Sequence, residues 1–522
     1  MAQEPVPHIL TLGNRQLRYW HGGKGAELVL LPGLVLSAAE QARRILALGQ
    51  GWSVFAMEPP GIGISQLAGL NGAEDWTAFL AAAIDALGCR QAPLVSFDLL
   101  NGLAAQIADR LAVPAGCRLH LANDYLGSAP IDPPASVRGN GGHLIDMWSL
   151  LRDANMLEPG GTRIATEGAE LPQPDVLHET LIAAAADPAA FSRLAGLARA
   201  APRPAVEAPP QELGARLGRM RENAPAGHVA PPRNDGLRDG VWRDYADIPS
   251  GRMHLRRAGQ GKPLLVLHAA PGSADHLGPV IPGLARGHEV VAPDYIGNGE
   301  SARPRAEVSI GGMAQDVLDL ADSLGFGQFD IWGSHTGANV AIEASLLAPG
   351  RVGRMVLEAP ILLDPGFTED IFRNYFQPIV PNRWGTHLID AWNFRRDLML
   401  FWPWYRQERA AARTVGVPAL DVQHANVIGL LQSGATYQKT YKAAFAYPTA
   451  KRMAMLTCPS LVCAGRWDSL YNSLEDTRGM SLAGVTVVET PATVHYPGQD
   501  AAAVEETLAI YLRFLAGAPL TS

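Results

Sequence analysis

Three residues carry the chemistry that this sequence suggests. His335 lies in the segment Gly333-Ser334-His335-Thr336-Gly337, between an apolar stretch and an Ala-rich stretch. Asp468 and His495 follow much later in the chain. A neutral imidazole can act as a nucleophile or a base, and a carboxylate can orient it. We therefore expect His335, Asp468 and His495 to form one catalytic group, in which Asp468 orients His495.

The elements that position these residues alternate between strand and helix. Short apolar segments without polar alternation predict parallel strands buried on both faces. These segments are Leu264–His268, Glu289–Pro293, Phe329–Trp332, Arg354–Glu358, Ser460–Ala464 and Thr486–Glu489. Helices are expected over Met313–Leu324, Ala338–Leu347 and Ala502–Leu515. The alternation predicts an α/β fold with a mostly parallel sheet and helices on both faces.

Five motifs in order resemble those of the α/β-hydrolase superfamily. They are His268–Gly272, Asp294–Ser301, Gly333–Gly337, Ala464–Asp468 and Val494–Pro497. The resemblance implies a helical cap, and a catalytic triad in the chain order nucleophile, acid, histidine. It also implies an oxyanion hole formed by the backbone N–H groups of Ala270 and Thr336. His335 stands where the superfamily usually has a serine on a sharp turn.

This histidine leaves three functions open. In the first, His335 is a nucleophile or base that cleaves a small ester, thioester or activated C–C bond of an acyl or aromatic substrate. In the second, His335 and His495 transfer protons in a cofactor-independent lyase or decarboxylase. In the third, the site binds a ligand without turnover. Ser334 is disfavoured as nucleophile because Trp332 would then take a position that must be small, and Glu358 is the alternative acid.

The chain repeats itself, with a nearly constant offset. Three segments of the first half match three of the second in the same order: Glu58–Ser65 with Asp294–Ser301, His143–Trp148 with His387–Trp392, and Asp175–His178 with Asp421–His424. We infer a tandem duplication. The expected parts are a truncated unit over 1–200, a Pro- and Ala-rich linker over 201–240 with one helix near Gln211–Asn223, and a catalytic unit over 241–522. The cap of the catalytic unit is expected over about 364–447.

The first copy is expected to be non-catalytic. Asp98 takes the position of the nucleophile, but Leu100 would crowd the turn, and the copy ends before a late histidine. We expect the two copies to pack against each other within one chain, and homo-oligomers are also compatible with the sequence.

The cap contains polar and aromatic residues that repeat between the copies. Since His387, Asp390, Trp392, Arg396 and His424 recur in the inactive copy, we expect them to form a structural hydrogen-bonded set. The alternative is a substrate-binding role, for which the candidates are His268, Trp392, His387, His424, Arg396 and Trp404.

Composition excludes several other classes of protein. The 522 residues are 47% hydrophobic with a formal net charge of −8, so a nucleic acid is not an expected partner. The 4 cysteines are too scattered for a disulfide framework or a zinc site. No cofactor, metal or membrane segment is expected, a small molecule is the expected substrate, and the predicted location is the cytoplasm.

Overall fold

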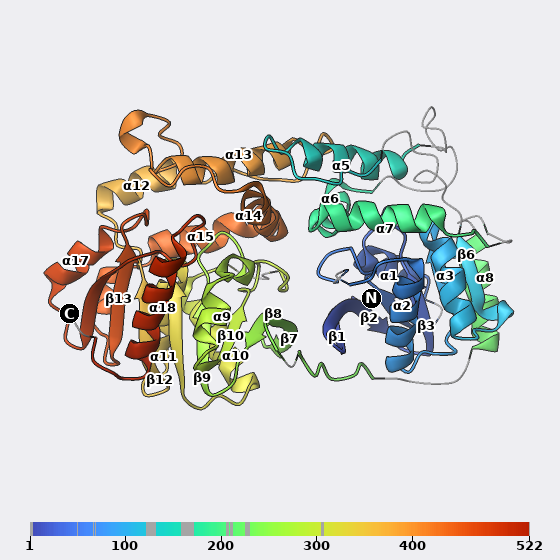
Figure 1. The fold of residues 1–522 in the computed structure, drawn as a ribbon, viewed down its shortest axis with the longest axis horizontal. Coiled ribbons are helices and arrows are strands. Elements are labelled where there is room, and N and C mark those ends of the chain that lie inside the picture. Colours follow the sequence, from blue (N-terminus) through green and yellow to red (C-terminus); the bar gives the residue numbers. More distant parts are fainter. Residues whose placement is uncertain are drawn as a thin grey trace. The chain divides into compact units, whose positions relative to one another are not determined.

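A computed structural model describes residues 4–520 apart from 50, 66, 68, 122–131, 158–171, 205–207, 209–211, 225–229, 238 and 304–306. The chain forms two compact units (Figure 1). Unit 1 comprises Met1–Leu237 and Pro381–Ile389, and unit 2 comprises Arg238–Val380 and Asp390–Ser522. The boundary near 237 lies close to the expected start of the catalytic unit at 241. The short segment Pro381–Ile389 was expected in the cap of the second unit, but it belongs to unit 1.

Unit 1 is built on a six-stranded sheet in the order β1-β2-β4-β3-β5-β6. Its strands are β1 (Val6–Leu12), β2 (Arg15–Gly23), β3 (Ala26–Leu31), β4 (Trp52–Met57), β5 (Leu94–Phe97) and β6 (Arg118–Leu121). Strands β3 to β6 run parallel, whereas β1 and β2 are antiparallel. The helices include α1 (Ala38–Ala47), α2 (Ala73–Ala86), α3 (Asn101–Arg110), α5 (Gly142–Ala154), α6 (Pro174–Ala185), α7 (Pro188–Ala200) and α8 (Leu213–Asn223).

Unit 2 has an eight-stranded sheet in the order β7-β8-β10-β9-β11-β12-β13-β14. The strands are β7 (Trp242–Ile248), β8 (Gly251–Ala258), β9 (Lys262–Leu267), β10 (His288–Pro293), β11 (Phe329–Ser334), β12 (Val352–Glu358), β13 (Ser460–Gly465) and β14 (Val485–Thr490). The helices beside the sheet include α9 (Val280–Leu284), α10 (Ile310–Ser323), α11 (Thr336–Leu347), α17 (Ser473–Met480) and α18 (Ala501–Leu515). Between β12 and β13 lie the helices of the cap, α12 (Pro365–Asn374), α13 (Thr386–Leu400), α14 (Leu420–Ser433) and α15 (Tyr437–Ala446), followed by α16 (Thr449–Met453).

The α/β fold with mostly parallel sheets is confirmed. Strands β11 and β13 are buried at every position, as expected of parallel strands covered by helices on both faces. On one face of the unit 2 sheet, side chains such as Val266, Trp332 and Val356 pack with Leu508 and Tyr511 of α18. This packing holds the carboxyl ends of β11, β12 and β13 side by side.

The strand order supports the proposed duplication. The first six strands of the unit 2 sheet, β7 to β12, have the same spatial order as the six strands of unit 1. Unit 1 has no equivalents of β13 and β14 among its described residues. The duplication remains a proposal, and it predicts the same order of strands in both units.

The expectation of a linker over 201–240 is wrong for part of that segment. Ala208 pairs with Leu121 on the free edge of β6, and its N–H donates to the carbonyl of His120 at 2.8 Å. Helix α8, which matches the one helix expected there, buries Leu217 and Met220 in the core of unit 1. These contacts cover the edge that a truncated sheet would otherwise expose.

A tight turn joins β11 to α11 and depends on two glycines. A Cβ on Gly333 would overlap the carbonyl oxygen of Gly337, and a Cβ on Gly337 would overlap that of Leu267. Both positions therefore require a residue without a side chain, because the backbone of the turn packs directly against β9.

Within the described residues, no single helix is long and apolar enough to cross a membrane. Helices α6 and α7 taken together are long and apolar enough for a membrane span, but the chain bends by 91° between them.

Gly337→Ala tests the close packing of this turn. The added Cβ overlaps the Leu267 carbonyl, so the free energy of unfolding should fall by roughly 1–3 kcal/mol in urea denaturation. Gly327→Ala is the matched control, because a Cβ at Gly327 meets nothing within 4 Å, and its effect should be below about 0.5 kcal/mol. Equal stability of the two variants would contradict this packing.

Candidate active site

His335 occupies the tip of the turn between β11 and α11. Its backbone adopts φ 48° and ψ −108°, a conformation that non-glycine residues rarely adopt. The N–H of His335 donates to the carbonyl of Glu358 at 2.9 Å, which ties the turn to the end of β12. The side chain is 15% exposed, whereas the adjacent Ser334 is fully buried. His335 is therefore the residue of this turn that a substrate can reach.

The His335 ring is held by Asp468, which follows β13. The Nε2 atom of His335 lies 2.9 Å from Oδ1 and 3.0 Å from Oδ2 of the Asp468 carboxylate. Because an ionised carboxylate only accepts hydrogen bonds, we assign the ring proton to Nε2. The other ring nitrogen, Nδ1, has no hydrogen-bond partner among the described residues and keeps its lone pair. Burial alone raises the pKa of Asp468, but the charge and hydrogen bond of His335 hold that pKa below its usual range.

His495 has a different carboxylate partner from the one expected. Its Nδ1 lies 2.8 Å from Oε2 of Glu358, and the hydroxyl of Tyr511 donates to Oε1 of Glu358 at 2.7 Å. The expectation that Asp468 orients His495 is therefore wrong in this structure. The physical reason is that Asp468 is engaged with His335, whereas the alternative acid Glu358 ends β12 directly beside the end of β11.

The second nitrogen of His495 faces Ser334. The distance from its Nε2 to Ser334 Oγ is 3.2 Å, so Ser334, His495 and Glu358 form a hydrogen-bonded chain. Ser334 is the last residue of β11 and lies below the tip of the turn. Since its side chain is fully buried, it contacts His495 and not the space above the turn.

The rings of His335 and His495 pack edge to face. Their centroids are 5.6 Å apart at 83°, and the Tyr496 ring lies 4.9 Å from His495 and 6.3 Å from His335. Burial by itself lowers the pKa of His495, but the Glu358 carboxylate and the more distant Asp468 raise this pKa above its usual range. The site thus contains two imidazole–carboxylate pairs, one at the tip of the turn and one beside it.

The backbone donors expected for an oxyanion hole lie near this turn. The N–H of Ala270 points to the hydroxyl of Thr336 at 3.3 Å, and Thr336 begins α11. The first N–H groups of a helix have no partner within the helix, so they can stabilise negative charge. His268 is fully buried, with Nδ1 2.8 Å from the Ala269 carbonyl and its ring against Tyr295. It supports the loop and is not placed to bind a substrate.

Two of the candidate substrate-binding histidines, His387 and His424, are buried. His387 belongs to unit 1, where its Nε2 is 3.1 Å from Nδ1 of His178 and its ring packs against Trp148. Burial and the neighbouring His178 lower the pKa of His387 to about 3, so the His387 ring stays neutral. His424 is buried in α14, beside Gln423, whose amide donates to the Trp392 carbonyl at 3.1 Å.

The remaining cap candidates have structural positions. Trp392 is buried, and the Trp404 indole donates to the Tyr375 carbonyl at 3.1 Å within an aromatic cluster of the cap. Arg396 is exposed and lies 3.7 Å from its neighbour Asp397, while Asp390 is also exposed. The exposure of Asp390 and Arg396 gives no support to the expected polar set of Asp390, Arg396 and His424.

Unit 1 has a similar turn that holds an aspartate. Asp98 has φ 48°, like His335, and a Cβ on Gly33 would overlap the Asp98 carboxylate. Burial raises the pKa of Asp98 to about 7 despite hydrogen bonds from backbone N–H groups, of which that of Leu99 is the first. The carboxyl group thus lies against the loop that corresponds to the oxyanion loop of unit 2.

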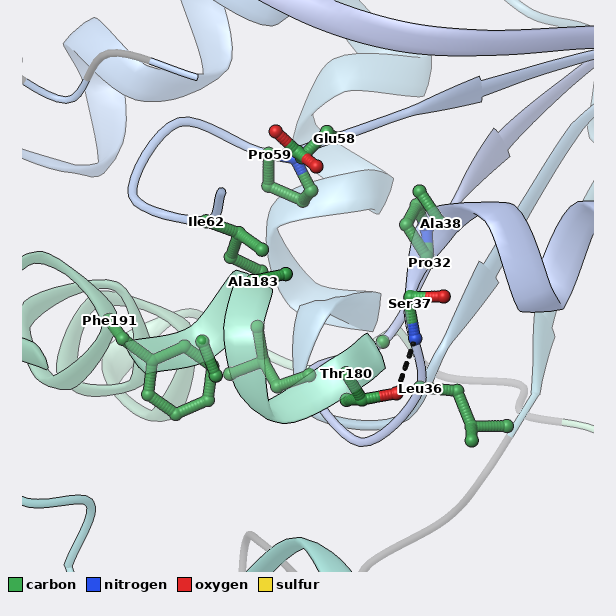
Figure 2. A pocket seen from close by; sticks show the side chains of 13 residues that line it. Pro32, Leu36, Ser37, Ala38, Glu58, Pro59, Ile62, Thr180, Ala183 and Phe191 are labelled. Carbon is green, nitrogen blue, oxygen red and sulfur yellow. Dashed lines mark hydrogen bonds between the residues drawn. The ribbon is translucent and has the colours of Figure 1, made fainter. Parts of the chain in front are cut away.

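A small cavity lies beside this loop of unit 1 (Figure 2). Its empty volume is about 270 Å³, and this volume includes space that is open to solvent. Helix α6 lies along it, and the Thr180 hydroxyl of α6 accepts a hydrogen bond from the Ser37 N–H at 3.0 Å. The lining is largely apolar and contains no histidine among the described residues: Pro32, Gly33, Leu34, Leu36, Ser37, Ala38, Glu58, Pro59, Ile62, Thr180, Ala183, Ala184 and Phe191.

In the described part of both units, no group of three or more histidine, cysteine, aspartate or glutamate side chains is placed to hold a metal ion.

Comparison with known proteins supports the same fold. Residues 262–458 match the model of the alpha/beta hydrolase fold family. The matched segment includes the turn that carries His335. An uncharacterized protein of Mycobacterium tuberculosis is 29% identical over 153 residues, which are 29% of this chain and 41% of that protein. A soluble epoxide hydrolase of a Corynebacterium species is 40% identical over 101 residues, 19% of this chain and 35% of that enzyme. The chain thus spans less than half of the length of these two relatives.

Among solved structures, epoxide hydrolase A of Mycobacterium thermoresistibile aligns with 54% of this chain and 100% of its own, at 23% identity and a TM-score of 0.41.

Glu358→Gln tests the assignment of Glu358 to His495. Removing the carboxylate should lower the pKa of His495, which NMR can follow by assigning the ring signals against a His495→Gln variant. The stabilisation from the charged pair is present at low pH and is lost as the pH rises through the raised pKa of folded His495. The stability difference between wild type and Glu358→Gln should therefore shrink with rising pH.

Asp468→Asn is the matched comparison. If the His495 titration moved strongly in Asp468→Asn and not in Glu358→Gln, Asp468 and not Glu358 would be the partner of His495.

Proposed function

We propose that unit 2 hydrolyses an acyl substrate, a small ester, thioester or activated C–C bond, with His335 as nucleophile. The observation that carries this proposal is the His335 ring at the tip of the strained turn, with Nε2 held by Asp468 and Nδ1 without a partner among the described residues. A turn of this kind presents its central side chain to substrate above the sheet.

In the first step, the Nδ1 lone pair of His335 attacks the acyl carbonyl. The negative charge that develops on the carbonyl oxygen is stabilised by the N–H groups of Ala270 and Thr336 at the start of α11. The bond to the leaving group then breaks, and the leaving group departs as an anion that takes a proton from solvent. This leaves an acyl-imidazolium on His335, acylated at Nδ1 and still protonated at Nε2. Asp468 stabilises the positive charge that the ring carries during this step, because its carboxylate accepts the Nε2 proton in a hydrogen bond.

In the second step, water attacks the acyl-imidazolium and His495 takes a proton from the water. The neutral form of His495 has its proton on Nδ1, where Glu358 accepts it, so Nε2 is the basic atom. Attack breaks the bond from the acyl carbon to Nδ1 of His335 and releases the acid. Because Glu358 and Asp468 raise the pKa of His495, activity should increase as the pH rises through that pKa.

The match to the family model supports this proposal. The alpha/beta hydrolase fold family model covers the turn of His335, and one relative is named as a soluble epoxide hydrolase. These similarities favour hydrolysis as the type of reaction.

A lyase is the second candidate, and one observation favours it. Each histidine has its own carboxylate, so His335 and His495 form two separate acid–base groups 5.6 Å apart. Two such groups can remove a proton from a substrate and return it at another atom, with no covalent intermediate.

A panel of p-nitrophenyl esters separates these functions. Wild type should release p-nitrophenolate, and His335→Ala and His495→Ala should each lower kcat/KM by about 10²–10⁴-fold, because they remove the nucleophile and the base. His335→Ser should retain or gain ester hydrolysis, because serine is the usual residue at this turn. Spectrophotometry at several pH values provides the measurement.

Ser334→Ala is the control for the position of the nucleophile. Because Ser334 is fully buried and its hydroxyl hydrogen-bonds to His495, its loss should lower kcat/KM much less than His335→Ala does. The reverse order would assign catalysis to Ser334, and no turnover of any ester by wild type would favour the lyase or a ligand-binding protein.

A further inference from the structure

Arg395, an arginine of the cap, has no acidic partner among the described residues. Arg395 lies on α13, and its Nη1 contacts the carbonyl oxygen of Pro271 at 3.5 Å, the limit of a hydrogen bond. The Nε atom of Arg395 is buried and has no hydrogen-bond partner in the described part of the chain. A buried donor of a charged group that has no acceptor lowers the stability of the folded protein, so its presence needs an explanation.

Several other partly buried arginines of unit 2 have carboxylate partners. Arg257 lies 2.7 Å from Glu289, and Arg452 lies 2.8 Å from Glu343. Arg243 and Arg256 share Asp275. Arg395 differs, since no aspartate or glutamate of the described chain lies within ion-pairing distance of it. Arg354 and Arg413 also have no carboxylate partner among the described residues, but their guanidinium groups lie over the rings of Phe514 and Tyr496. Arg395 has neither kind of partner in the described part of the chain.

The surroundings of Arg395 are polar but carry no compensating charge. Tyr375 and Tyr441 hydrogen-bond to each other at 2.9 Å and interact electrostatically with Arg395. Burial, followed by the charge of Arg395, lowers the pKa of His276 to about 3, so that ring is neutral and does not repel an anion. The Nε2 of His276 is also buried without a partner among the described residues.

These groups adjoin the candidate active site. Pro271, which Arg395 contacts, directly follows Ala270, whose N–H belongs to the expected oxyanion hole. Tyr496, a third tyrosine that interacts with Arg395, has its ring next to both His335 and His495. The guanidinium therefore lies on the cap side of the oxyanion loop, near the group that would be attacked.

We infer that Arg395 binds a carboxylate of the substrate, so that the preferred substrates are acyl compounds with a second, ionised carboxyl group. A guanidinium presents two parallel N–H donors that match the two oxygens of a carboxylate. The carboxylate provides the charge that the protein does not provide. The inference about the substrate class rests on the proposed function, whereas carboxylate binding at Arg395 does not.

The first experiment compares two esters of equal chain length, mono-p-nitrophenyl glutarate and p-nitrophenyl pentanoate. Wild type should prefer the half-ester in kcat/KM by about 10-fold or more, the range of a charge-assisted hydrogen bond. Arg395→Gln should bring this ratio close to one, and Arg395→Lys should keep part of it. Arg373→Gln, which changes an exposed arginine of α12 that pairs with Glu369, should keep the wild-type ratio.

The second experiment measures binding without turnover. Titration calorimetry of glutarate into wild type should show saturable binding, which Arg395→Gln weakens by about 10-fold or more, while the uncharged glutaramide binds weakly to both. Circular dichroism checks that Arg395→Gln is folded. If it is not folded, Arg395→Met takes its place in both experiments.

The outcomes separate the two proposals. Glutarate binding that depends on Arg395, without ester hydrolysis, supports the carboxylate site and contradicts the proposed hydrolysis. Ester hydrolysis without a preference for the half-ester, or with a preference that survives in Arg395→Gln, overturns the carboxylate site. Glutarate binding that is equal in wild type and Arg395→Gln also overturns it.

Discussion

The hydrogen bond between His335 and Asp468 is the interaction on which the site depends. It joins a strained turn after β11 to the residue that follows β13, two strands away, and it fixes which nitrogen of His335 carries the proton. The contact forms because parallel strands deliver their carboxyl ends to one edge of the sheet. Without Asp468, the ring at the tip of the turn would lose both its orientation and its tautomer.

The second imidazole–carboxylate pair follows from the same edge of the sheet. Glu358 ends β12, and the register of β11 and β12 places it beside Ser334. It holds His495 from one side while the Ser334 hydroxyl holds the other nitrogen. The usual arrangement of serine, histidine and acid is therefore present one residue before the tip of the turn, as a support for His495. This arrangement leaves the exposed position to His335.

The sequence was sufficient to predict the strands and helices of unit 2 and the residues of the turn. It was less informative about which side chains contact one another. Strand and helix patterns located β9 to β14 and the turn of His335, because buried parallel strands and small residues leave clear signals. The predicted carboxylate partner of His495 was wrong. Glu358 ends β12 and Asp468 follows the neighbouring strand β13, and the spacing of the motifs cannot decide which of the two acids contacts His495. The position of His387 in unit 1 and the burial of Leu217 depend on tertiary packing, which periodicity does not report.

The most direct test of the account is the identity of the residue that becomes acylated. The enzyme is mixed with a p-nitrophenyl ester, quenched in acid during the initial burst, digested and mapped by tandem mass spectrometry. The account predicts one acyl group on the peptide that contains Gly333–Gly337, located on His335 and absent from His335→Gln. An acyl group on Ser334, or turnover without any acylated peptide, would contradict it.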